Sequence, residues 1–152
     1  MAHVGQEIEN PVTGERIVFR ITAADSGGDL LELDDFYTRE GHRSVEHVHP
    51  GMEERFEVIS GRVAFLVAGE RQEVGPGEVV VVPPGTPHVA WNATTAPAHL
   101  RLQFRPALRW EDFVERLFAL AAEGRTNELG VPEPALLMDL LQEFSAELAP
   151  AL

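Results

Sequence analysis

A chain of 152 residues is long enough for one well-buried domain but not for two. All 12 basic residues are arginine and cysteine is absent, which excludes disulfides, thiolate metal sites and Schiff-base chemistry on lysine. The formal net charge of −13 argues against nucleic acid as a partner, because such a surface repels a polyanion. The chain opens without the charged-then-apolar pattern of a signal peptide and has no apolar run of the roughly 18 residues that a membrane helix needs, so we expect a cytoplasmic protein without a membrane partner.

The first part of the chain has the pattern of half-buried strands. In residues 16–22, apolar side chains occupy every second position, which predicts a strand with one buried face. A weaker strand is predicted for residues 30–38, where Asp34 and Asp35 interrupt the pattern.

Further short strands follow between turns that are rich in glycine and proline. They are predicted for residues 56–59, 62–68, 71–74, 79–82, 89–92 and 99–105. The run 79–82 consists of four valines, which is typical of a strand covered on both faces. Many short strands without helices between them indicate an all-β antiparallel sandwich or barrel.

The stretch 41–61, GHRSVEHVHPGMEERFEVISG, contains the first candidate metal ligands. His47 and His49 are two positions apart, so on a strand their side chains share one face. The following Pro-Gly pair breaks the strand, which allows Glu54 to return to the same side as the histidines.

A second stretch, 77–92, reads GEVVVVPPGTPHVAWN and contributes one more imidazole. A stiff, proline-rich turn immediately precedes His88 and fixes the place of its ring. Three neutral imidazoles and one carboxylate suit a divalent ion of Fe, Mn, Co, Ni, Cu or Zn.

Together these stretches resemble the two signature motifs of the cupin superfamily, G-x5-H-x-H-x3-4-E-x6-G and G-x5-P-x-G-x2-H-x3-N. Every fixed position is filled. The resemblance implies a jelly-roll barrel over residues 11–106 that holds one divalent transition metal ion. It implies that the metal ligands are His47, His49, Glu54 and His88. Glu53 would fit the spacing to the histidines but not the x6 spacing to Gly61, so we expect Glu54 to be the acidic ligand.

Strand alternation also indicates which residues line the barrel around the ion. Phe56 and Val58 share the parity of Glu54, while Ala90 and Asn92 share that of His88. We expect these four to line the pocket, although plain core packing is an equal alternative for the apolar ones.

The last predicted strand has one apolar and one polar face. Burying an unpaired arginine costs several kcal/mol, whereas burying an apolar side chain gains about 1.5–3 kcal/mol. We therefore expect the apolar face inside, leaving the pocket mostly apolar; arginines inside would instead create a site for carboxylate or phosphate. The inner residues would be Leu100, Leu102 and Phe104, and the outer ones His99, Arg101, Gln103 and Arg105.

Residues 107–149 change to helical spacing and form a C-terminal extension of the same domain. Helices are predicted for residues 110–123 and 135–148, each with an apolar stripe that needs covering. The stripes would pack on the outside of the barrel or form a dimer contact, and we expect a homodimer.

Four protein ligands leave one or two positions on a metal ion for O2 and a chelating small molecule. Because the chain resembles single-domain cupin dioxygenases, we expect a mononuclear metal-dependent enzyme of dioxygenase type. Two alternatives are a metal-dependent isomerase or lyase and a ligand-binding cupin that catalyses no reaction.

Overall fold

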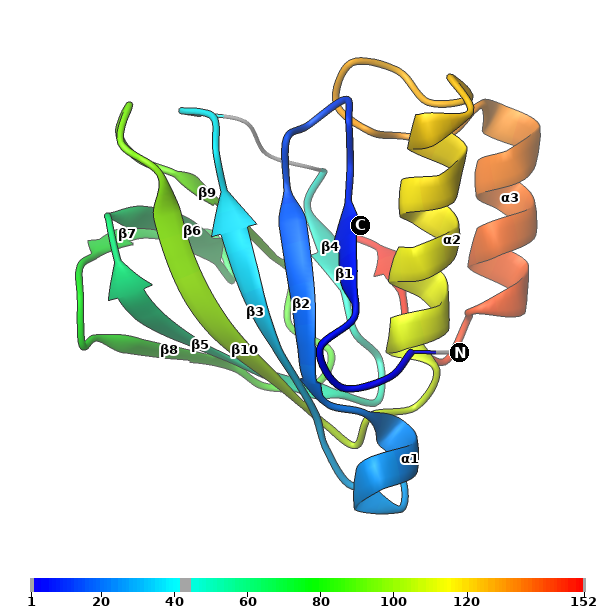
Figure 1. Ribbon diagram of the computed structural model, residues 1–152, viewed down its shortest axis with the longest axis horizontal. Coiled ribbons are helices and arrows are strands. Elements are labelled where there is room, and N and C mark those ends of the chain that lie inside the picture. Colours follow the sequence, from blue (N-terminus) through cyan, green and yellow to red (C-terminus); the bar gives the residue numbers. More distant parts are fainter. Residues whose placement is uncertain (1, 42–44, 152) are drawn as a thin grey trace.

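The computed structural model describes residues 2–41 and 45–151. Two antiparallel sheets face each other, and two helices cover one side of them (Figure 1). The first sheet has the order β1 (Glu7–Glu9), β2 (Arg16–Ile21), β3 (Leu31–Tyr37), β10 (Ala98–Arg105), β5 (Glu53–Ser60) and β8 (Val79–Val82). The second has the order β11 (Ala149–Pro150), β4 (His47–Val48), β9 (His88–Asn92), β6 (Val63–Val67) and β7 (Glu70–Val74).

The long helices are α2 (Trp110–Ala122) and α3 (Pro134–Glu143). Figure 1 shows α2 beside β1 and α3 on the far side of α2. Two antiparallel sheets followed by two helices confirm the predicted fold class. None of the helices in the described part of the chain is long and apolar enough to cross a membrane.

One helix was not predicted, and two local predictions were wrong. The unpredicted helix is α1 (Ala23–Ser26), which follows β2 and is capped by the Thr22 hydroxyl, because this hydroxyl accepts a hydrogen bond from the Asp25 N–H. The second long helix ends at Glu143 instead of residue 148, and the chain then turns and adds β11 to the edge of the second sheet. The valine strand β8 lies at the edge of the first sheet and is covered on one face only: Val80 and Val82 are buried, whereas Val79 and Val81 are 42% and 46% exposed.

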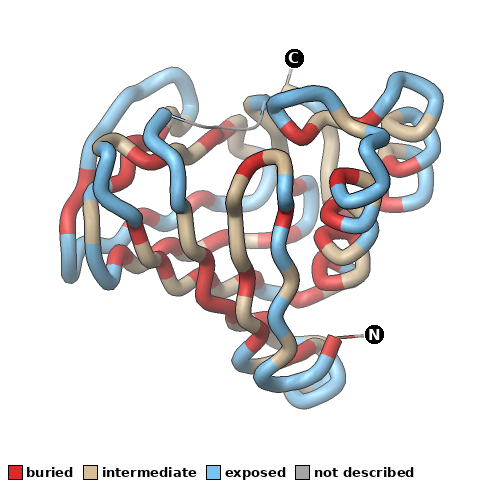
Figure 2. Tube along the Cα trace, turned by 45° about the horizontal axis from the view of Figure 1, so that its top comes forward, coloured by how far each residue is buried: buried red, intermediate tan, exposed pale blue. Residues whose placement is uncertain are grey.

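The core lies between the sheets, where buried and exposed residues alternate along the strands (Figure 2). On β10, Leu100, Leu102 and Phe104 are buried, which confirms the predicted inner face. Arg101 lies on the outer face, where its Nε donates a hydrogen bond to Asp34 of β3 at 3.0 Å.

Candidate metal centre

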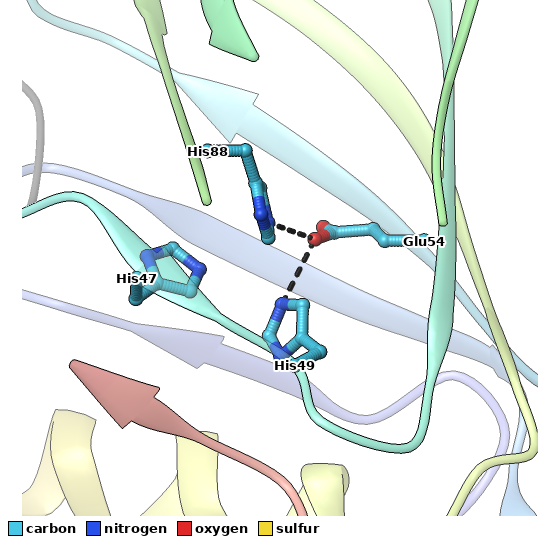
Figure 3. Close-up of side chains that lie close together, drawn as sticks. All are labelled: His47, His49, Glu54 and His88. Carbon is cyan, nitrogen blue, oxygen red and sulfur yellow. Dashed lines mark hydrogen bonds and ion pairs between the residues drawn. The ribbon is translucent and has the colours of Figure 1, made fainter. Parts of the chain in front are cut away.

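Four side chains from separate segments meet between the two sheets. His47 lies on β4 directly opposite His88 of β9, His49 follows β4, and Glu54 lies on β5 of the other sheet. Their potential ligand atoms all lie within 4.8 Å of one another, and Figure 3 shows the four side chains pointing toward a common centre. The segments that the sequence motifs single out are thus brought together in space.

Each histidine ring is held by a backbone carbonyl oxygen on its Nδ1 side. The acceptors are Val45 for His47 (3.0 Å), Glu147 for His49 (2.8 Å) and Thr86 for His88 (2.9 Å). A carbonyl oxygen can only accept, so the proton of each neutral ring must sit on Nδ1. The Nε2 lone pairs are therefore the free donor atoms of the rings. Fixing the outer nitrogen in this way is how proteins orient histidine ligands of metal ions.

Glu54 faces two of these lone pairs. Its Oε1 lies 3.0 Å from Nε2 of His49 and 3.0 Å from Nε2 of His88. With both rings neutral and protonated on Nδ1, three electron-rich atoms would face each other without a proton between them. Such an arrangement is stable only when a cation, either a proton or a metal ion, lies among them. The donor set of three imidazole nitrogens and one carboxylate therefore fits a divalent transition metal ion.

Burial and mutual charge prepare the ligands for binding. Burial alone would raise the pKa of Glu54, but when Nε2 of His49 and of His88 carries a proton, hydrogen bonding to these rings lowers the Glu54 pKa to about 2. Burial lowers the pKa of His47 to about 4, with repulsion from the other two histidines acting in the same direction. Burial also acts against protonation of His88, but the neighbouring Glu54 outweighs it and raises the His88 pKa. Near neutral pH, Glu54 is ionised and His47 is neutral, which are the forms that bind a metal ion.

The segment between β3 and β10 matches a known domain family. Residues 37–103 match the profile of the cupin domain. The chain carries a cupin domain. That result confirms the resemblance seen in the two motifs.

Solved structures of other cupins share the fold at low sequence identity. An RmlC-like cupin from Shewanella frigidimarina is 21% identical, with a TM-score of 0.57, over 74% of this chain and 96% of that one. A predicted oxalate decarboxylase from Thermotoga maritima is 16% identical, with a TM-score of 0.58, over 68% of this chain and 92% of that one. A sugar phosphate isomerase of the cupin superfamily from Silicibacter pomeroyi is 19% identical, with a TM-score of 0.54, over 66% of this chain and 70% of that one. A search of curated proteins found no match.

The helical extension of this cupin contributes to the site. Trp110, the first residue of α2, packs its ring edge-on against His49, with the centroids 4.7 Å apart. The ring of Phe104 on β10 also lies edge-on to this imidazole, with the ring centroids 5.9 Å apart. Because both rings are apolar and buried, they shield His49 from water and restrict its rotation.

A cavity of about 220 Å³ opens beside the ligands, and His47, Glu54 and His88 form part of its wall. Phe56 and Ala90 also lie on this wall, whereas Val58 and Asn92 do not. Val58 is fully buried in the core, and the Asn92 amide donates a hydrogen bond to the Ala96 carbonyl at 2.8 Å. Asn92 therefore closes a turn instead of facing a ligand.

The residues on this wall that the sequence did not single out include Glu15, Asp35 and Trp110. A signal for Asp35 was available, because it shares strand parity with the buried Leu31 and Leu33. The sequence pattern does not predict that Glu15 lies next to this strand. It also does not predict that the helix beginning at Trp110 packs beside the cavity.

Proposed function

We propose that this cupin is a mononuclear metal-dependent enzyme of dioxygenase type, which acts on a small and mostly apolar molecule in the cavity. The convergence of three Nδ1-anchored imidazoles and the ionised Glu54 carries the proposal. A divalent ion bound there would act as a Lewis acid and, if redox-active, would supply electrons to O2.

The wall next to the ligands favours chemistry that depends on such an ion. It consists of apolar side chains, among them Phe56, Leu102 and Phe104. The other carboxyl groups on the wall are Glu15 and Asp35, and Asp35 lies four residues along β3 from Leu31, which is in register with Phe104 and Glu54. Since the described cavity wall has no further acid or base beside the ligands, the side chains there position the substrate and exclude water.

Metal content and oxygen uptake test the proposal. Protein purified without added metal should contain about one divalent redox-active ion per chain by elemental analysis. His47→Ala combined with His49→Ala should contain none, while its circular dichroism stays that of the wild type. Oxygen consumption should accompany turnover when small enolic and aromatic compounds are screened under air.

Stoichiometric metal in the double variant would contradict the assigned ligands. Zinc as the native ion, or turnover without oxygen uptake, would overturn the dioxygenase proposal in favour of an isomerase or lyase. Binding without any turnover would favour a ligand-binding cupin.

A further inference from the structure

Asp35 is a buried acid on the cavity wall. Residues of β3 alternate between the two faces, so that Leu31, Leu33 and Asp35 point inward while Asp34 points outward. Asp35 is only 3% exposed and lines the cavity. Its Oδ1 has no hydrogen-bond partner in the part of the chain that the structure describes. A buried oxygen without a partner is costly, which marks this part of the cavity as short of hydrogen-bond donors.

Glu15, which immediately precedes β2, forms a pair with Asp35. Ile17 of β2 lies opposite Asp35, and Glu15, two residues before Ile17, shares its face, which brings the two carboxyl groups together. Because a carboxylate can only accept, a hydrogen bond between them requires that one retains a proton. Burial raises the pKa of both groups, and the charge of Glu54 acts in the same direction. A pair that shares one proton carries one negative charge.

The pair is separate from the candidate metal centre. In the first sheet, Leu31 lies in register with Phe104 and Glu54, whereas Asp35 lies beside Leu100. Four residues along a strand correspond to roughly 13 Å, so the acid pair occupies another part of the cavity.

No fixed cation of the described chain neutralises this pair. Apart from the two histidine ligands, no basic residue among those described lines the cavity. Arg39 lies on a smaller adjoining pocket of about 110 Å³, which also touches Glu15 and Tyr37. Its guanidinium donates a hydrogen bond to the Val12 carbonyl. The positive charge that would complement the pair must therefore come from a molecule in the cavity.

We propose that Asp35 and Glu15 bind the ammonium group of a small apolar amine, which is the substrate class of this cavity. An ammonium group in the cavity donates hydrogen bonds to the carboxyl oxygens of the pair and compensates its charge. An alcohol supplies a donor but no charge, and a carboxylate is repelled.

The rest of the cavity limits the body of the amine. Ile17, Leu33, Val114 and Phe118 line the same cavity and offer only apolar contacts. The volume of about 220 Å³ is below the roughly 300–1,000 Å³ of pockets for drug-sized ligands. A short aliphatic or single-ring amine fits these limits.

That the amine is a substrate rests on the proposed function. Amine binding itself uses other residues than metal binding, and the two are measured separately. The probe is n-hexylamine, protonated at pH 7 as lysine is, with n-hexanol and hexanoate as matched controls. In calorimetry with the purified protein, hexylamine should bind at least about tenfold more tightly than hexanol, because its hydrogen bond is charge-assisted, and hexanoate should not bind.

A variant of the acid pair and a variant of a neighbouring acid of β3 test the inference. Asp35→Asn combined with Glu15→Gln removes the charge whichever of the two groups holds the proton, so the hexylamine affinity should fall at least about tenfold while hexanol affinity and metal content stay unchanged. Asp34→Asn should leave hexylamine binding intact, because Asp34 faces outward and pairs with Arg101. Equal hexylamine affinity in the double variant Asp35→Asn/Glu15→Gln and in the wild type, or hexanoate binding as tight as hexylamine, would overturn the inference. If the purified protein contained no metal but still bound hexylamine selectively, the proposed function would be contradicted and the amine site would not.

Discussion

Two adjacent glutamates at the start of β5 have opposite environments. Glu54 is buried between the sheets, and its Oε1 lies against two histidine rings. Glu53 is half-buried and pairs in register with Arg105, at the end of β10. The x6 spacing to Gly61 thus selected the residue whose carboxylate belongs to the His-Glu cluster.

Glu54→Gln should lower metal affinity by well over tenfold, because an amide lacks the charge that the ion requires of this ligand. Glu53→Gln, which changes the neighbouring acid in the same way, should leave the affinity unchanged. Titration of the metal-free proteins with zinc measures both. The reverse order of the two effects would show that Glu53 is the ligand.

The buried Asp35 also predicts a pH dependence of stability. Burial and the charges of Glu15 and Glu54 raise the Asp35 pKa well above its ordinary value, so the folded protein binds this proton more tightly than the unfolded chain. The contribution of Asp35 to the free energy of unfolding is therefore fully present below about pH 4 and is lost as the pH rises through the folded pKa.

Asp35→Asn cannot ionise, so its stability relative to the wild type should increase between pH 5 and pH 8. Urea unfolding of both proteins in the presence of a chelator gives the difference at each pH. A difference that stays constant over this range would show that the Asp35 pKa is not raised.

At the scale of strands and helices, local patterns predicted what depends on local sequence. Alternation predicted the inner face of β10, and helical spacing predicted α2 to within one residue at its end. The edge position of β8 and the early end of α3 could not be predicted, because both depend on which segment lies alongside. The same limit applies to the site. The motifs carry the four candidate ligands, but Glu15 and Trp110 reach the cavity only through tertiary packing.

The two faces of β10 should respond differently to truncation. Leu100 is fully buried, so Leu100→Ala should lower the free energy of unfolding by about 2–5 kcal/mol. The Arg101 side chain is 31% exposed, and its partner Asp34 also contacts His99 and Arg20, so Arg101→Ala should cost less than about 1 kcal/mol. Denaturant unfolding compares the two variants, and a larger loss for Arg101→Ala would mean that the ion pair matters more than the core contact.

At the scale of the whole molecule, the end of the chain connects the helices to the candidate metal centre. After α3 the chain turns back, and β11 pairs with β4, which carries His47. Glu147 contributes twice in this return. Its carbonyl accepts the hydrogen bond of His49, and its carboxylate accepts one from the backbone N–H of Arg109, just before α2. The extension is therefore part of the site as well as a cover for the barrel.

Shortening the chain from its C-terminus should lower the metal affinity only when the Glu147 carbonyl is lost. A chain that ends after Leu148 loses β11 but keeps the Glu147 carbonyl, and it should bind zinc nearly as tightly as the full chain. A chain that ends after Ser145 loses the carbonyl, so the His49 ring is no longer oriented, and its affinity should fall about 10–100-fold, as for other partners of metal-bound histidines. Glu147→Ala keeps the carbonyl and removes the carboxylate, so it should lower thermal stability without changing zinc affinity. Equal zinc affinity in the two shortened chains would show that the Nδ1 hydrogen bond of His49 does not orient the ligand.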